Sequence, residues 1–261
     1  WRGDGHMAGT LATALSGSSD TFTRAGTNET RSVNFVAAHD GFTLADLVAH
    51  SHKRNGRNGE HNRDGHDENY SWNNGIEGDH ANPAVLAKRR RDVAALLATL
   101  FASRVTIMLT AGDALGRTQH GNNNAYCQDN ELTWLDWAAA DQDLIDRTAE
   151  LSAIRKRFSV FGETHFLSGE QDVAWISPAG EPMTVADWED AVCPGFGMVL
   201  ETIDYSLKAE VQLAVLFNRS QAGLDFRLPT GDKGHWRPVS DHRDIRQIHL
   251  QPRSVEFFVK L

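Results

Sequence analysis

The chain has 261 residues, of which 40% are hydrophobic, and a formal net charge of -9. This length allows one large domain or two ordinary ones, with enough apolar residues for a core. The acidic balance argues against binding to a nucleic-acid backbone, and the sequence has no apolar run long enough to span a bilayer. Cys127 and Cys193 fit no metal-binding spacing, which favours a reducing, cytoplasmic environment.

The first predicted helix covers residues 6–17, where apolar residues recur at helical spacing until a glycine ends the pattern. An apolar run over residues 32–38 follows and leads directly into His39, Asp40 and Gly41. An unbroken run of this kind is typical of a parallel strand that is buried on both faces. Polar residues at its end then lie at the carboxyl edge of the sheet, where α/β enzymes carry out their chemistry. A buried ion pair or a turn cap explains His39 and Asp40 equally well.

A long polar loop is predicted over residues 41–80, which are rich in Asn, Gly and His. Loops of this length inside a compact domain usually carry function. His50 and His52 resemble a metal-binding pair, but no third and fourth ligand follow at a fixed spacing. The sequence therefore predicts no metal site, and a metal-dependent hydrolase is the least favoured alternative.

The second predicted helix begins with a cap at Asn82, and its apolar stripe runs through residues 93–101. A second buried strand is predicted at residues 105–111, so that strand, loop, helix and strand form a right-handed βαβ unit. Another polar loop covers residues 116–137, and a third helix follows over residues 141–157.

From about residue 159 the pattern changes to short apolar runs separated by turns. These runs lie at residues 173–176, 198–200, 211–217, 224–228 and 255–259. The fourth run alternates apolar and charged residues, which is typical of a half-exposed strand. We therefore expect an α/β part over residues 1–158, followed by an all-β part over residues 159–261.

Aromatic rings in the two polar loops lie among amide and carboxylate residues. Rings stack on the C–H face of a sugar, while amides and carboxylates bind its hydroxyls, so this mixture suits a carbohydrate site. We predict Tyr70, Trp72 and Tyr126 as substrate-binding residues. Trp134 and Trp137 are instead expected to anchor their loop on the core.

Residues 38–44 read Ala-His-Asp-Gly-Phe-Thr-Leu, which resembles the His-Asp motif at the seventh barrel strand of the alpha-amylase superfamily. Its extension through Asp46 resembles the isoamylase and glycogen debranching branch. Further segments similar to that branch, including its C-terminal β domain, are residues 58–65, 69–73, 112–130, 172–175 and 187–188. The resemblance covers almost the whole chain, and the combination of motifs is highly specific.

The resemblance implies the C-terminal part of a (β/α)8 barrel, with its last two strands and helices, followed by a β-sandwich. It implies a retaining glycoside hydrolase that cleaves α-1,6 branch linkages in glycogen or limit dextrin without a cofactor. Asp40 matches the carboxylate that stabilises the transition state, and His39 would hydrogen-bond the same sugar ring. The nucleophile and the general acid lie on earlier strands that this chain does not contain, so we expect the chain alone to be inactive. Ala114 departs from the family, which has a glutamate there.

A non-catalytic glucan-binding module, carried by the β part and the loop aromatics, is the main alternative. Both interpretations predict a branched α-glucan as the partner, and neither predicts a nucleic acid or a membrane. A partial barrel also exposes strand edges, which invites self-association.

Overall fold

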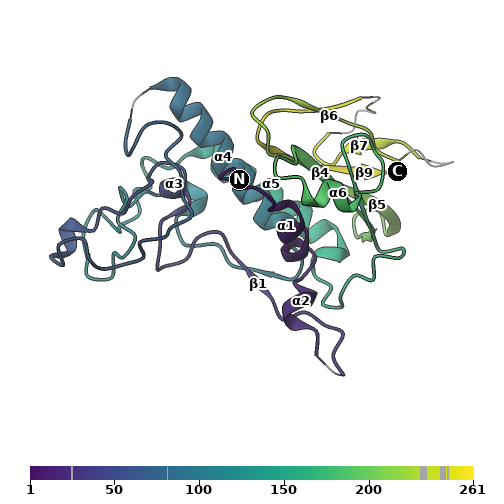
Figure 1. The fold of residues 1–261 in the computed structure, drawn as a ribbon, viewed down its shortest axis with the longest axis horizontal. Helices are drawn as coiled ribbons and strands as arrows, with labels where there is room; N and C mark the ends of the chain where they lie inside the picture. The colour runs from purple at the N-terminus through teal and green to yellow at the C-terminus, as the bar shows by residue number, and fades with distance from the viewer. Residues whose placement is uncertain (25, 81, 230–233, 242–244, 246) are drawn as a thin grey trace.

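The computed structural model describes residues 1–24, 26–80, 82–229, 234–241, 245 and 247–261. The two long helices, α4 (Pro83–Ala102) and α5 (Gln142–Arg157), lie between long loops on one side and a set of strands on the other (Figure 1). The strands belong to the C-terminal part of the chain, drawn in green and yellow in Figure 1. Within the described ranges, no helix combines the length and apolar character needed to cross a membrane.

The predicted helices are confirmed, together with the caps of the two long ones. Asn82 Oδ1 accepts a hydrogen bond of 2.9 Å from the Ala84 amide at the start of α4. Asp141 Oδ1 accepts one of 3.2 Å from the Leu144 amide at the start of α5. The other helices and 3-10 turns are α1 (Ala8–Leu15), α2 (Ser19–Phe22), α3 (Leu44–Leu47), α6 (Val185–Glu189), η1 (Gly56–Asn58), η2 (Asp113–Leu115) and η3 (Ser159–Phe161).

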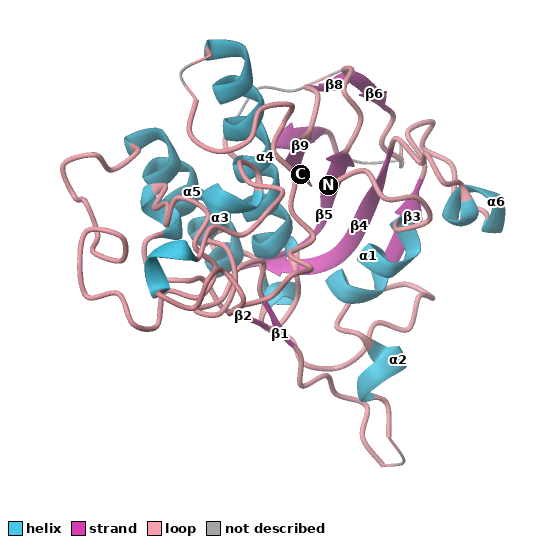
Figure 2. Cartoon of the chain, turned by 60° about the vertical axis from the view of Figure 1, so that its left-hand side comes forward, coloured by secondary structure: helices cyan, strands magenta, loops and turns pink. Residues whose placement is uncertain are grey.

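Two short parallel strands, β1 (Val33–Asn34) and β2 (Thr106–Ile107), precede the two polar loops and lie beside each other in Figure 2. Their parallel pairing confirms the predicted strand–helix–strand order. The expected burial of the first strand on both faces is wrong, because Val33 and Phe35 are 53% and 55% exposed. A parallel strand is buried only when neighbours flank it and helices cover it. Among the described residues, β2 is the one strand that pairs with β1.

The C-terminal strands form a five-stranded antiparallel sheet in the order β3-β4-β5-β9-β7 and a separate two-stranded pair, β6-β8. Their bounds are β3 (Val173–Ile176), β4 (Gly195–Asp204), β5 (Ala209–Asn218), β6 (Leu224–Phe226), β7 (Trp236–Pro238), β8 (Ile248–Leu250) and β9 (Ser254–Lys260). Every predicted apolar run overlaps one of these strands. The sequence prediction missed β7 and β8, which are only three residues long; β6 is as short, but its alternation continues in the sequence through Leu228.

Both faces of the five-stranded sheet are covered by apolar side chains. On β5, Leu213 and Val215 belong to a core shared with α4 and α5, whereas Ala214 and Leu216 pack with residues of β6 and β8. Burial on both faces explains why residues 213–217 are apolar without alternation. The helices and the sheet therefore share one continuous core, and the division at residue 158 stays a prediction.

Candidate functional site

The His39-Asp40 pair lies beyond the end of β1, on the surface. The two side chains are 91% and 63% exposed, and His39 Nε2 lies 3.5 Å from Asp40 Oδ2. This exposure excludes a buried ion pair. The next residue, Gly41, has a φ of +125° and donates a backbone hydrogen bond of 2.9 Å to the Asn123 carbonyl oxygen. The chain thus turns at Gly41, and the exposed carboxylate of Asp40 is open to a ligand.

A second acidic residue, Asp113, follows β2 as Asp40 follows β1. Its carboxylate accepts a hydrogen bond of 3.1 Å from the Leu44 amide and is almost fully buried. Burial raises the pKa of Asp113 to about 6. The sequence prediction did not treat this residue as part of the site, although the signal was the same: an apolar run that ends in a glycine and an acid.

The two polar loops, residues 41–80 and 116–137, are joined by a network of side-chain amides. Asn55 Nδ2 donates a hydrogen bond to Asn123 Oδ1 at 2.8 Å, and Asn122 Nδ2 donates one to Asn58 Oδ1 at 2.8 Å. Asn58 also donates to Asp64 Oδ2 at 2.7 Å, and this hydrogen bond lowers the pKa of the Asp64 carboxyl. Because buried amides need partners, the many asparagines of these loops stabilise one defined arrangement.

The three predicted substrate-binding aromatics lie in two different places. Tyr126 is 71% exposed on the second loop. Tyr70 and Trp72 line a cavity of about 410 Å³ that His39, Asp40 and Tyr126 do not line. The Trp72 indole nitrogen donates a hydrogen bond of 2.8 Å to Asp92 Oδ2, so this ring also has a structural contact. The structure brings His39 and Asp40 together, and the binding roles of the aromatics stay predictions.

Trp134 and Trp137 do not anchor their loop, and that expectation is wrong. Their side chains are 62% and 70% exposed. The Trp134 indole nitrogen donates a hydrogen bond of 3.0 Å to Asp129 Oδ1 on the surface. Leu132, which is 2% exposed, lies inside instead. Its small apolar side chain fits the interior without a polar atom to satisfy.

His50 is fully buried, and both of its ring nitrogens lack a hydrogen-bond partner. Its Nε2 lies 3.8 Å from Asp46 Oδ1, and its Nδ1 lies 3.8 Å from Glu77 Oε1. Burial lowers the pKa of His50, which favours the neutral ring. His52 is exposed. In the part of the chain that the structure describes, no group of three or more His, Cys, Asp or Glu residues is arranged to hold a metal ion.

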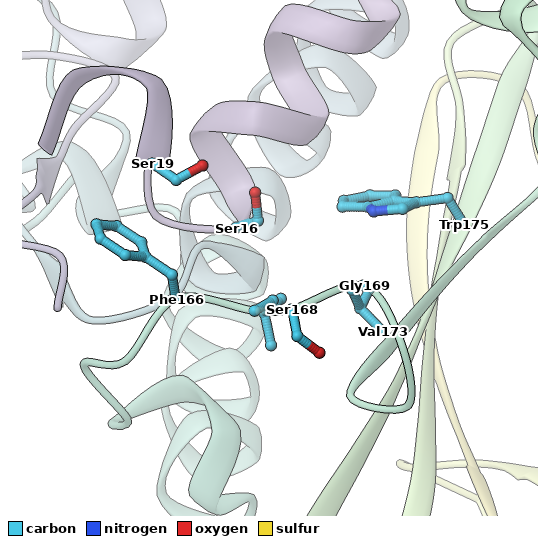
Figure 3. Close-up of a pocket in the computed structure, with 8 residues that line it drawn as sticks. Ser16, Ser19, Phe166, Ser168, Gly169, Val173 and Trp175 are labelled. Atoms are coloured by element: carbon cyan, nitrogen blue, oxygen red, sulfur yellow. The ribbon is translucent and has the colours of Figure 1, made fainter. Parts of the chain in front are cut away.

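A smaller pocket of about 120 Å³ lies between the end of α1 and the segment before β3 (Figure 3). Its lining residues are Ser16, Ser19, Phe166, Leu167, Ser168, Gly169, Val173 and Trp175. This lining contains hydroxyl groups but no carboxylate or histidine. The pocket therefore offers no acid–base pair, and the His39-Asp40 region is the better candidate for glycoside chemistry.

Solved structures with a similar fold are pullulanases. The pullulanase from Bacillus acidopullulyticus matches 100% of this chain and 27% of its own, with a TM-score of 0.67 and 18% identity. The pullulanase from Anoxybacillus sp. LM18-11, crystallised with maltotetraose, matches 100% of this chain and 32% of its own, with a TM-score of 0.67 and 17% identity. The fold of this chain is therefore that of a segment of these pullulanases.

Relatives with higher sequence identity have names that refer to glycogen. The glycogen operon protein GlgX homolog of Mycobacterium tuberculosis (strain H37Rv) is 46% identical over 198 residues, which are 72% of this chain and 28% of the relative. The glycogen debranching enzyme of Klebsiella pneumoniae (strain 342) is 42% identical over 241 residues, 92% of this chain and 34% of the relative. No family model matches the chain. The chain is similar to these glycogen-related proteins over most of its own length, and it spans about a third of the length of these relatives.

Proposed function

We propose that this chain forms part of a cytoplasmic, retaining glycosidase that hydrolyses α-1,6 branch linkages in glycogen or limit dextrin. In this proposal β1 and β2 are the last two strands of a (β/α)8 barrel within residues 1–158, and residues 159–261 form a β-sandwich domain. The observation that carries the proposal is the exposed His39-Asp40 pair after a parallel strand, in a chain 42% identical to a glycogen debranching enzyme.

The proposed role of Asp40 is electrostatic. In a retaining reaction one carboxylate attacks the anomeric carbon, a second protonates the leaving oxygen, and water then hydrolyses the glycosyl intermediate. Asp40 would accept hydrogen bonds from sugar hydroxyls and favour the distorted, oxocarbenium-like state, while His39 donates to the same ring. These contacts accelerate the reaction only if they strengthen in the transition state.

The nucleophile and the general acid are assigned to the part of the relatives that this chain does not span. We therefore expect the purified chain to release no reducing sugar from glycogen. Release of reducing sugar by the purified chain would contradict this assignment.

A chimera tests the role of Asp40 directly. In the Klebsiella pneumoniae relative, the 241 matched residues are replaced by those of this chain. We expect the chimera to hydrolyse limit dextrin, and Asp40→Asn to lower its kcat by about 10²- to 10³-fold, because one preorganised charge contact is lost. Asp20→Asn, on the exposed helix α2, is the matched control and keeps the parent kcat. An unchanged kcat in a folded Asp40→Asn chimera would refute the proposed role.

A non-catalytic glucan-binding module is the second candidate, and the exposed ring of Tyr126 favours it. This function predicts that the purified chain binds maltotetraose, and that Tyr126→Ala weakens binding while Asp40→Asn does not. Tyr205→Ala, at an exposed turn after β4, is the control. Trp72→Ala is a poorer test, because it also removes the hydrogen bond to Asp92.

A further inference from the structure

The position of Asp40 depends on a contact made by the residue that follows it. Gly41 donates its backbone hydrogen bond to the carbonyl oxygen of Asn123, at 2.9 Å, from the first loop to the second. The Asp40 side chain is exposed, and its contact with His39 is long, at 3.5 Å. The backbone therefore sets where the carboxylate lies, and Asn123 holds that backbone.

Asn123 is in turn held by Asn55 through a reciprocal pair of hydrogen bonds. Asn55 Nδ2 donates to Asn123 Oδ1 at 2.8 Å, and the Asn123 amide donates to Asn55 Oδ1 at 3.0 Å. Both side chains are fully buried, and the two residues lie 68 positions apart in the sequence. The side-chain nitrogen of Asn123, Nδ2, donates to the His66 carbonyl oxygen at 2.8 Å and to Asn69 Oδ1 at 2.6 Å. Every polar atom of the Asn123 side chain is therefore used inside the protein.

The contact between Asn55 and Asn123, called the junction below, has no space for a further side-chain atom at Gly65. Gly65 has a φ of +71°, and a Cβ added there would lie 2.3 Å from Asn123 Oδ1 and 2.7 Å from Asn55 Nδ2. Even a methyl group would push these two amides apart. Only glycine at this position allows both the backbone conformation and the close approach.

We propose that Asn55 and Asn123, packed against Gly65, are positioning residues that hold Asp40 in place by fixing the backbone of Gly41 between the two loops. This inference rests on the proposed function for the role of Asp40 toward a glucan. The same junction also sets the distance between Asp40 and the second loop, which carries Tyr126 three residues after Asn123. Asn55 and Asn123 touch no substrate in this arrangement, because both are buried.

Two variants test the junction in different ways: one changes its hydrogen-bonding groups, and the other changes only its packing. Asn55→Asp keeps the shape of the side chain but turns a donor into an oxygen that faces Asn123 Oδ1 and the Asp64 carbonyl. Gly65→Ala keeps every amide group chemically intact and adds only a methyl group that crowds the two side chains. Asn28→Asp, on an exposed residue outside both loops, is the matched control.

The first readout is amide hydrogen exchange of the purified chain, followed by NMR. We expect Asn55→Asp and Gly65→Ala each to speed exchange of the Gly41 amide roughly tenfold or more, while amides of the buried helix α4, such as that of Leu97, keep their protection. Asn28→Asp should change neither. Unchanged Gly41 exchange in both junction variants would overturn the inference, and so would an equal loss of protection throughout α4.

The second readout is kinetic, in the chimera described above. A misplaced Asp40 should lower kcat on the order of 10²-fold with little change in KM, because the lost contact acts in the transition state. Equal kcat values for the junction variants and the Asn28→Asp control would overturn the inference. If Asp40→Asn also leaves kcat unchanged, the proposed function fails, and Gly41 exchange alone then decides whether the junction fixes Asp40.

Discussion

At the residue scale, burial rather than residue type separates the two carboxylates that follow β1 and β2. Asp40 is open to solvent, whereas Asp113 is 2% exposed and has a pKa raised to about 6. Both stand at the end of an apolar run in the sequence. Their different environments arise because the Asp113 carboxylate accepts a hydrogen bond from the Leu44 amide of α3, a contact between residues 69 positions apart.

We predict that Asp113→Asn stabilises the chain at neutral pH. Because the folded state raises the pKa of Asp113 from 3.8 to about 6, it binds the proton more tightly than the unfolded state. The stability that this proton provides is present below about pH 4 and is lost as the pH rises through about 6. Asparagine keeps an acceptor for the Leu44 amide without a buried charge, so the variant should be more stable at pH 7 by about 3 kcal/mol.

Urea unfolding of both proteins between about pH 4 and 8 measures this difference. The gain from Asp113→Asn should shrink toward acidic pH. Asp143→Asn, on an exposed residue of α5, should show no such gain. A gain that is equal at every pH would show that the charge of Asp113 is not its cause.

At the scale of elements, caps made the long helices predictable, whereas β1 and β2 were predicted too long and too buried. A cap acts within one turn of its helix, so three or four residues contain the whole signal. Strand burial depends on neighbouring elements from elsewhere in the chain. An apolar run indicates that such neighbours are needed, but it does not show whether they are present.

Asp141 offers a test of the cap of α5, because it has two partners. One carboxylate oxygen accepts from the Leu144 amide, and the other lies 3.0 Å from the Arg90 guanidinium on α4. We expect Asp141→Ala to lower the free energy of unfolding by about 1 kcal/mol, the usual cost of a lost cap. Asp141→Asn keeps the cap and loses only an exposed ion pair, so its cost should stay below about 0.5 kcal/mol. Equal losses in the two variants, measured by urea unfolding, would assign the effect to the ion pair.

At the scale of the whole molecule, the β1-β2 pair presents apolar side chains to solvent, and within the described ranges no further strand pairs with either of its edges. Val33 and Phe35 are both more than half exposed, and Met108 is 39% exposed. An exposed strand edge with apolar neighbours is a surface on which other strands pair. We therefore expect the isolated chain to associate with itself through this edge.

Phe35→Glu tests this expectation, because it places a charge beside the edge without touching the core. Sedimentation velocity over a concentration series should show association of the parent chain and a shift toward monomer for the variant. Tyr205→Glu, on an exposed residue of another part of the surface, should associate like the parent. Association that is unchanged by Phe35→Glu would place the contact elsewhere.

The sequence by itself determined the long helices, the parallel pairing of β1 and β2, the strand-rich C-terminal part and the resemblance to glycogen debranching enzymes. These features depend on spacing, caps and motifs that lie within short segments. The tertiary structure alone decided that Asp113 is buried while Trp134 and Trp137 are not, that Tyr70 and Trp72 line a cavity apart from Asp40, and that Asn55 holds Asn123 across 68 residues. The physical reason is that periodicity reports the faces of a single element, whereas contacts between loops depend on the path of the whole chain.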